Sequence, residues 1–235
     1  MNTTLAKRFW TQTNVVAVGD EFTIHLDARP VRTPAKAPLV VPTRTLAEMV
    51  AKEWEAQGSK PDPNTMPATR MANAAIDKVT SQFDEVCGVI SAYGDSDLLC
   101  YRATSPVELT SRQGEKWDPL LDWADETLGA RLMPVAGIMP VAQQPEALAT
   151  LAGHVSALTP YQLAAFHDLV AISGSLIIGF AAAKHLHSLE DLWLRASLDE
   201  LWQEEQWGRD EDAFTHRERK RQDFFDAGQF FTACN

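Results

Sequence analysis

The chain has 235 residues, and 45% of them are hydrophobic, which is enough for a substantial core in one large or two small globular domains. A net charge of −11 argues against a nucleic-acid-binding protein, because phosphate groups require a basic surface and the densest basic segment, residues 216–221, itself contains an acid. The three cysteines, Cys87, Cys100 and Cys234, lack metal-ligand spacing, which argues against a zinc site or a disulfide framework and favours a reducing compartment.

The first forty residues have the character of short strands. The pattern predicts strands over residues 14–18, 21–26 and 38–41, and Gly19-Asp20 is a plausible hairpin turn. No apolar segment or Arg/Ser-rich amphipathic segment occupies residues 1–10, so we expect a cytoplasmic, bacterial protein without a targeting signal.

Helices should cover this small antiparallel sheet. Residues 43–57 have helical apolar spacing, and Thr45 with Glu48 resembles a capping box. We expect further helices over residues 68–83 and 84–95, followed by a strand over 98–102 that rejoins the sheet.

Beyond residue 105 nearly all of the chain is expected to be helical, with proline in first turns and glycine just after helix ends. The predicted helices span residues 108–128, 145–158, 160–186, 189–207 and 210–228, and residues 131–141 form an extended connector. The predicted fold class is therefore α+β, with a small N-terminal α/β domain over residues 1–104, in which helices cover short antiparallel strands, and a C-terminal helical bundle over 105–235.

The longest apolar run without charge, residues 169–183, is too short to cross a bilayer, so we expect a buried helix and no membrane insertion. Gly174, Ser175 and Gly179 lower its helix propensity, and close contact with neighbouring helices is the expected reason.

Residues 189–208 are the most informative segment, because three tryptophans and six carboxylates occur together there without a catalytic pattern. As one continuous helix, the segment places Trp193 and Trp207 on one face, with Glu200 and Glu204 on or beside it. Two interpretations remain open. The acids either reach solvent or pair with an internal basic residue, or they belong to a binding face with aromatic anchors.

The sequence contains no nucleophile elbow, phosphate-binding loop or dinucleotide fingerprint. His185 and His187 would point to opposite sides of a helix, which disfavours a metal site. We therefore predict no catalytic residues, no metal site and no cofactor. An enzyme that acts on a small metabolite between the two domains remains the alternative from a different functional class.

Eight sequence blocks, in the right order over most of the chain, resemble the ATP synthase assembly chaperones that bind the free alpha subunit of the catalytic head, known from mitochondria and alphaproteobacteria. The blocks are KRFW at 7–10, LDARPVRTP at 26–34, EWEAQ at 53–57, MPATR at 66–70, DLLCYR at 97–102, WDP at 117–119, SLII at 175–178, and a final block of DE at 199–200 with WQEEQWG at 202–208. Ala28 stands where glycine is the more usual turn residue.

This resemblance implies an α/β domain followed by an orthogonal helical bundle, and a monomeric chaperone without cofactors that keeps the alpha subunit soluble until it joins the beta subunit. Its location would be the bacterial cytoplasm, or the mitochondrial matrix in eukaryotic relatives. A stable structural subunit of a larger complex is a further alternative. The family concentrates partner binding on its acidic C-terminal helix, which implies the residues Glu200, Gln203, Glu204, Glu205 and Trp207.

Four residues outside this helix are secondary candidates for partner binding. Core packing is the favoured role for Trp54, with an interface role as the alternative. Arg29, Arg32 and Arg70 would clamp acids, and we favour internal salt bridges over contacts with the partner.

Overall fold

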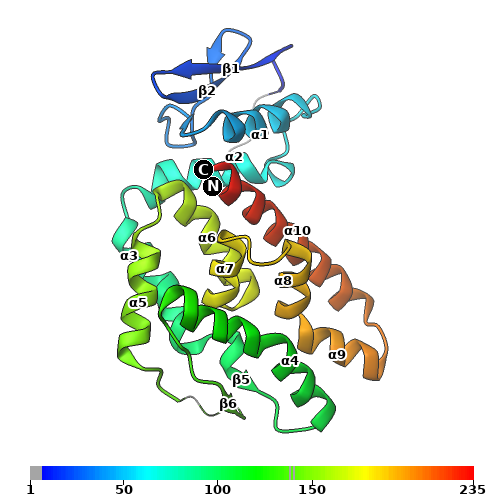
Figure 1. The fold of residues 1–235 in the computed structure, drawn as a ribbon. Helices are drawn as coiled ribbons and strands as arrows, with labels where there is room; N and C mark the ends of the chain where they lie inside the picture. The colour runs from blue at the N-terminus through cyan, green and yellow to red at the C-terminus, as the bar shows by residue number, and fades with distance from the viewer. Residues whose placement is uncertain (1–6, 138, 140) are drawn as a thin grey trace. The chain divides into compact units, whose positions relative to one another are not determined.

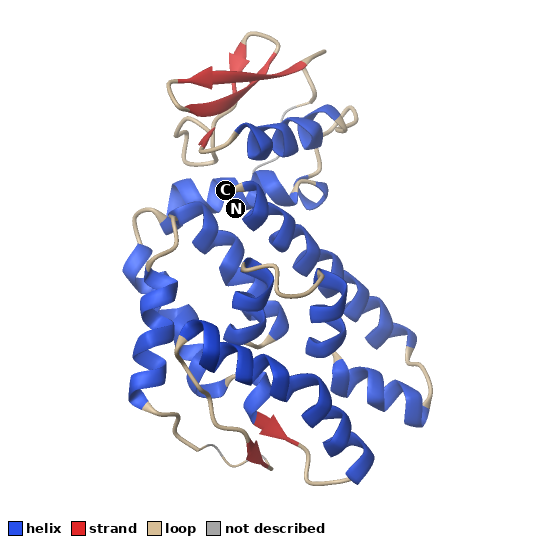
Figure 2. Ribbon diagram, in the orientation of Figure 1, coloured by secondary structure: helices blue, strands red, loops and turns tan. Residues whose placement is uncertain are grey.

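The computed structural model describes residues 7–137, 139 and 141–235 (Figures 1 and 2). Residues 1–6, on which the expected absence of a targeting signal partly depends, lie outside the described residues, as do positions 138 and 140 of the predicted connector. The described strands are β1 (Thr13–Val18), β2 (Glu21–Leu26), β3 (Arg29–Pro30), β4 (Val40–Val41), β5 (Tyr101–Arg102) and β6 (Val135–Ala136).

The helices confirm the α+β class and follow the predicted order. The α-helices are α1 (Arg44–Glu55), α2 (Pro67–Ala74), α3 (Phe83–Ser91), α4 (Val107–Trp123), α5 (Pro145–Ser156), α6 (Pro160–Ser173), α7 (Leu176–Ala183), α8 (Leu189–Ala196), α9 (Leu198–Trp207) and α10 (Glu211–Ala233). Wider π-helical turns continue α2 over Ala75–Val79 and α4 over Ala124–Leu128, and 3-10 turns span Pro63–Thr65, Ala92–Ser96 and Leu98–Cys100. No helix in the described part of the chain is long and apolar enough to cross a membrane.

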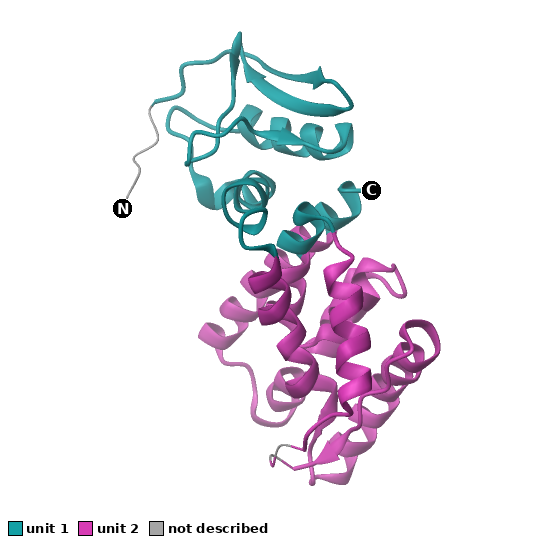
Figure 3. Ribbon diagram, turned by 90° about the vertical axis from the view of Figure 1, so that its left-hand side faces the viewer, with its two compact units in different colours: residues 1–83, 159–165, 229–235 teal, residues 84–158, 166–228 magenta. Residues whose placement is uncertain are grey.

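The chain divides into two compact units (Figure 3). The first contains residues 1–83, 159–165 and 229–235, and the second contains residues 84–158 and 166–228. The start of α6 and the end of α10 thus belong to the first unit. No local sequence pattern reveals this long-range association. The domain boundary at residue 104 remains a prediction.

The sheet of the first unit begins with the predicted hairpin. Val18 pairs with Glu21 across Gly19-Asp20, and the register continues to Thr13 opposite Leu26. Gly19 has a φ of +63°, which glycine adopts without steric cost. Strands β3 and β4 both pair with the opposite edge of β2, at different positions along it.

Helix α1 covers one face of this sheet, as predicted (Figure 1). Its buried residues Leu46, Ala47 and Val50 recur at helical spacing and pack with buried Ile24 and other strand residues to form a core. The predicted capping box is wrong. Thr43 caps the helix instead, and its hydroxyl accepts a hydrogen bond from the amide of Leu46 at 3.1 Å.

The predicted strand over residues 98–102 does not rejoin the N-terminal sheet. Its first half is the 3-10 turn Leu98–Cys100, and β5 pairs in parallel with β6 as a separate two-stranded sheet. Asp97 explains the turn, because its carboxylate accepts the amide hydrogen of Leu99 at 3.0 Å and caps the turn locally.

The predicted helix over residues 160–186 is two helices. Gly174 takes a φ of +70° between α6 and α7, and the hydroxyl of Ser175 caps α7 by accepting from the amide of Ile178. The expected close helix contact is confirmed at Gly179, where an added Cβ would lie 2.6 Å from a side-chain carbon of Val170. Residues 176–182 are all buried, so α7 lies in the core of the second unit.

Candidate partner-binding site

Residues 189–207 also form two helices, α8 and α9, which meet at Ser197. The single helical wheel that placed Trp193 and Trp207 on one face is therefore wrong: Trp193 is buried, whereas the side chain of Trp207 is 78% exposed. The break has a local reason. The hydroxyl of Ser197 bonds back to the carbonyl of Trp193 at 2.7 Å, and bonds of this kind bend helices.

Helix α9 has one buried face and one exposed face. Leu198 and Trp202, four residues apart, are buried. Asp199 and Glu200 lie in the first turn, where carboxylates interact favourably with the positive end of the helix dipole. Gly208, with a φ of +88°, ends the helix just after Trp207.

Four of the five predicted site residues share one side of α9. Glu200, Gln203, Glu204 and Trp207 follow the spacing of one helix face, and all four line one groove of about 590 Å³. The other residues that line this groove, hereafter the α9–α10 groove, lie around the start of α10: Gly208, Arg209, Asp210, Ala213, Phe214, His216 and Arg217.

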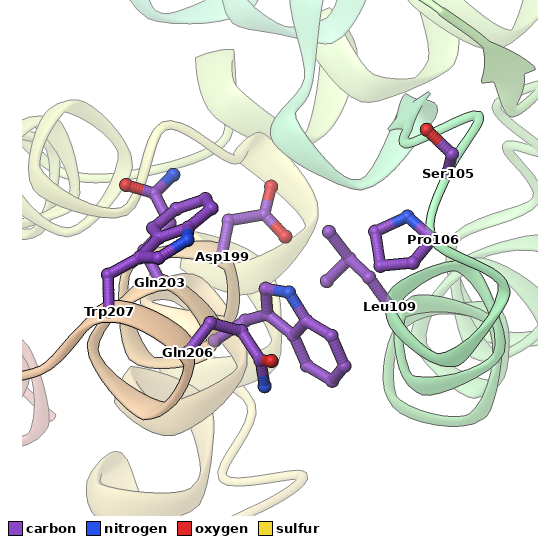
Figure 4. A pocket seen from close by; sticks show the side chains of 8 residues that line it. Ser105, Pro106, Leu109, Asp199, Gln203, Gln206 and Trp207 are labelled. Carbon is purple, nitrogen blue, oxygen red and sulfur yellow. The ribbon is translucent and has the colours of Figure 1, made fainter.

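A second groove, of about 320 Å³, lies between α9 and the start of α4 (Figure 4). In the close-up, Trp207 and Gln203 stand on one side and Pro106 and Leu109 on the other, with the Asp199 carboxylate between them. This α4–α9 groove is also lined by Ser105, Trp202 and Gln206. Trp207 and Gln203 line both grooves, so they mark the centre of the candidate site.

The Asp199 carboxylate is held in position from α4. It accepts a hydrogen bond of 2.7 Å from the side-chain amide of buried Gln113, whose oxygen accepts the backbone N–H of Ala103 at 2.8 Å. A fixed carboxylate beside indole rings is suited to a lysine or arginine side chain, because the rings contact its stem or its charge and the carboxylate balances the charge.

The two glutamates left open by the sequence have different environments. Glu204 forms an ion pair of 2.6 Å with Arg217 of α10, and their side chains are only 26% and 9% exposed. Glu200 is exposed and forms no ion pair within the described residues. Arg102 pairs with Asp118 at 2.7 Å, so it is not the internal partner of either glutamate.

Glu205, the fifth predicted residue, points to another side of α9. Both of its carboxylate oxygens accept hydrogen bonds from Arg112 of α4, at 2.9 and 2.8 Å. The Arg112 guanidinium also stacks 4.7 Å from the centre of the Trp202 ring. This arrangement anchors α9 to α4, so the structure assigns Glu205 an internal contact.

The secondary candidates all belong to the first unit. Trp54 is half-buried and meets the ring of Trp10 edge-on at 5.3 Å, which agrees with a packing role. Arg29 lies 5.2 Å from the ring centre of Phe9. Arg32 donates to the carbonyl of Lys36 at 2.9 Å. Arg70 of α2 is exposed. The internal salt bridges that we favoured for these three arginines are not found among the described residues, and a role in partner binding stays a prediction.

Sequence reasoning missed the residues opposite α9. Pro106 and Leu109 lie about ninety positions away in the chain, and nothing local links them to α9. The contact with Arg217 could have been predicted from the sequence. An acidic helix ends at Gly208 and the basic segment 216–221 comes soon after it, which favours ion pairs between the two consecutive helices. No group of three or more histidine, cysteine or acidic residues suited to a metal ion occurs among the described residues.

Comparisons with known proteins agree with the resemblance found in the sequence. Residues 7–125 match the family model for the ATP12 chaperone protein. The chain is 29% identical over 221 residues to the mitochondrial protein atp12 of Schizosaccharomyces pombe, covering 88% of this chain and 75% of that protein.

Solved structures agree over nearly the whole chain. The crystal structure of Atp12 from Paracoccus denitrificans superposes with a TM-score of 0.94 at 41% identity, covering 98% of this chain and 99% of that one. The Atu1473 protein of Agrobacterium tumefaciens gives a TM-score of 0.94 at 42% identity, covering 97% and 86%. The chain thus belongs to the ATP12 chaperone family.

Proposed function

We propose that this protein is an assembly chaperone of ATP synthase that binds the unassembled alpha subunit of the catalytic head. Acting as a monomer in the cytoplasm, it covers a surface of the alpha subunit that later meets the beta subunit, and it leaves when the ring forms. Membership of the ATP12 chaperone family supports the chaperone role. The exposed indole of Trp207, standing between two grooves, is the observation that carries the site.

The chemistry of the site supports a protein partner. Large exposed aromatic side chains beside polar groups are typical of interface hot spots, where the ring is buried on binding and supplies most of the affinity. Asp199 and Glu200 add negative charge at the two grooves. The expected counterpart is therefore a segment of the alpha subunit that presents a lysine or arginine next to apolar side chains.

The alpha subunit should remain soluble when it refolds with an equimolar amount of this protein and without ATP, because covering exposed apolar surface requires binding alone. Light scattering during refolding measures this effect. An unrelated acidic protein of similar size is the control, and equal protection by that control would contradict the proposal. Recovery of the chain at a fixed ratio in the finished synthase would instead favour the structural-subunit alternative.

Replacing Trp207 by alanine should weaken binding to the alpha subunit by about 2 kcal/mol, roughly thirtyfold, without changing the melting temperature, because the indole is exposed in the free protein. Isothermal titration and circular dichroism measure the two quantities. Val89→Ala is the matched control, since Val89 is 55% exposed on α3 and lines neither groove. Unchanged affinity of Trp207→Ala would remove α9 from the interface.

A further inference from the structure

Strand β1 forms one edge of the N-terminal sheet. It pairs with β2 along its whole length, and no other strand in residues 7–137, 139 and 141–235 pairs with it. Strands β3 and β4 pair with the far side of β2, so β2 is the only described strand that pairs with β1, and α1 packs on a face of the sheet. The opposite side of β1 is therefore available for one additional strand.

The backbone groups on this open side can be identified from the register. Gln12 accepts the amide hydrogen of Asp27 at 2.9 Å, and hydrogen-bonded pairs alternate along an antiparallel ladder. Asn14, Val16 and Val18 therefore bond to β2. The N–H and C=O groups of the alternate residues, Thr13, Val15 and Ala17, point to the open side, and no backbone group of these three residues has a hydrogen bond within the described residues.

This edge lacks the features that usually block pairing between chains. Natural edge strands carry lysine or other charges, proline or a bulge. Strand β1 reads TNVVAV, contains neither charge nor proline, and keeps an unbroken register with β2. Asn14, Ala17 and Val18 are exposed. An open, neutral, valine-rich edge stands out in a chain whose net charge is −11.

We propose that β1 binds an extended segment of the client subunit as an added β-strand. No side chain of β1 is charged, and the one carboxylate bonded to it, Glu55 of α1, lies at Thr13. The strand therefore fits an uncharged segment rich in β-branched residues, which pack well against the half-buried Val15 and Val16. Backbone hydrogen bonds supply most of the recognition in strand addition and tolerate different side chains. This inference depends on the proposed function, since an unassembled subunit is the expected source of an unpaired segment.

Amide hydrogen exchange at single-residue resolution tests the proposal with the unmodified chain. In the free protein, the amides of Thr13, Val15 and Ala17 should exchange much faster than those of Asn14, Val16 and Val18. Addition of the alpha subunit should slow the first three by at least about tenfold and leave the other three slow, because only the first three face the open edge.

A variant provides the second test. Ala17→Pro removes an N–H that the β1–β2 ladder does not use, and proline is tolerated at such edge positions. We expect at least about tenfold weaker binding with unchanged melting. Ala17→Ser keeps the N–H, is the matched control and should bind like the wild type.

The possible outcomes separate the two proposals. A complex that forms without slowing exchange at Thr13, Val15 and Ala17 would overturn the strand addition and leave the proposed function intact. Failure to form any complex would overturn both. The exchange of these amides could instead slow when the concentration of the chaperone alone is raised. That result would show that a second copy of the chain occupies the edge, and it would overturn the assignment of the client to it.

Discussion

Glu204→Lys is expected to lower the free energy of unfolding by about 3–5 kcal/mol, because it leaves the largely buried Arg217 without its counter-charge and adds a second cation beside it. The pair joins α9 to α10, so its loss should also disorder the α9–α10 groove. Chemical denaturation followed by circular dichroism measures the loss of stability.

Glu200→Lys is the matched control for this substitution. Glu200 lies one turn earlier on the same face of α9, has the same charge and is exposed, so its reversal should change the unfolding free energy by no more than about 0.5 kcal/mol. The two variants should separate folding from binding. Glu200→Lys should melt normally and bind the alpha subunit about tenfold more weakly at low salt, whereas Glu204→Lys should fail in both respects.

A normal melting curve for Glu204→Lys would show that the Arg217 pair contributes little to stability. Undiminished binding by Glu200→Lys would show that this carboxylate does not meet the partner. The double variant Glu204→Lys with Arg217→Glu restores opposite charges, and we expect it to recover part of the lost stability.

Stability should also depend on pH through Asp97, which is fully buried. One carboxylate oxygen accepts from the amide of Leu99 at 3.0 Å and the other from the amide of Ile177 at 3.1 Å, so the side chain joins the Leu98–Cys100 turn to the start of α7. Loss of hydration on burial raises the pKa of Asp97 to about 6, from an ordinary value of 3.8, although the hydrogen bonds that it accepts act in the opposite direction.

The sign of the pH effect follows from this raised pKa. Because the folded protein holds the proton more tightly than the unfolded chain, the contribution of Asp97 is most favourable below pH 3.8 and is lost as the pH rises through about 6. By pH 7 the loss amounts to about 3 kcal/mol. The unfolding free energy of the wild type, relative to that of Asp97→Asn, should therefore fall by about this amount between pH 4 and pH 7.

Urea denaturation at several pH values measures this difference. At any pH, Asp97→Asn should also lose about 1–3 kcal/mol in hydrogen bonding, because the amide presents an NH₂ group to one of the two backbone N–H donors. The control Asp95→Asn removes an exposed carboxylate two residues earlier in the chain. Parallel pH curves for Asp97→Asn and the wild type would contradict a buried, ionising Asp97.

The sequence determined most elements of this protein, because they depend on local chemistry. Gly19-Asp20 between alternating apolar residues predicted the β1–β2 hairpin, and helical apolar spacing predicted α1 as its cover. The family resemblance implied residues 200, 203, 204, 205 and 207, and four of them line one groove along α9, whereas the helical wheel that placed Trp193 beside Trp207 was wrong. The resemblance to the family was readable from short sequence blocks that follow one another in the family's order along the chain.

Tertiary structure decided where the long helices break and which charges pair. Gly174 at positive φ, with Ser175 as the cap of α7, separates α6 from α7, and the Ser197 hydroxyl bond separates α8 from α9. Glycine and serine also occur inside continuous helices, so their presence alone did not locate these breaks. The partner of Glu204 could not be chosen because any of several arginines is compatible with an acidic helix, and only the packing of α10 brings Arg217 within 2.6 Å. Long-range packing also forms the α4–α9 groove, because its two sides lie about ninety residues apart in the chain. Sequence periodicity predicts only contacts between residues within a few helical turns, so it could not predict this groove.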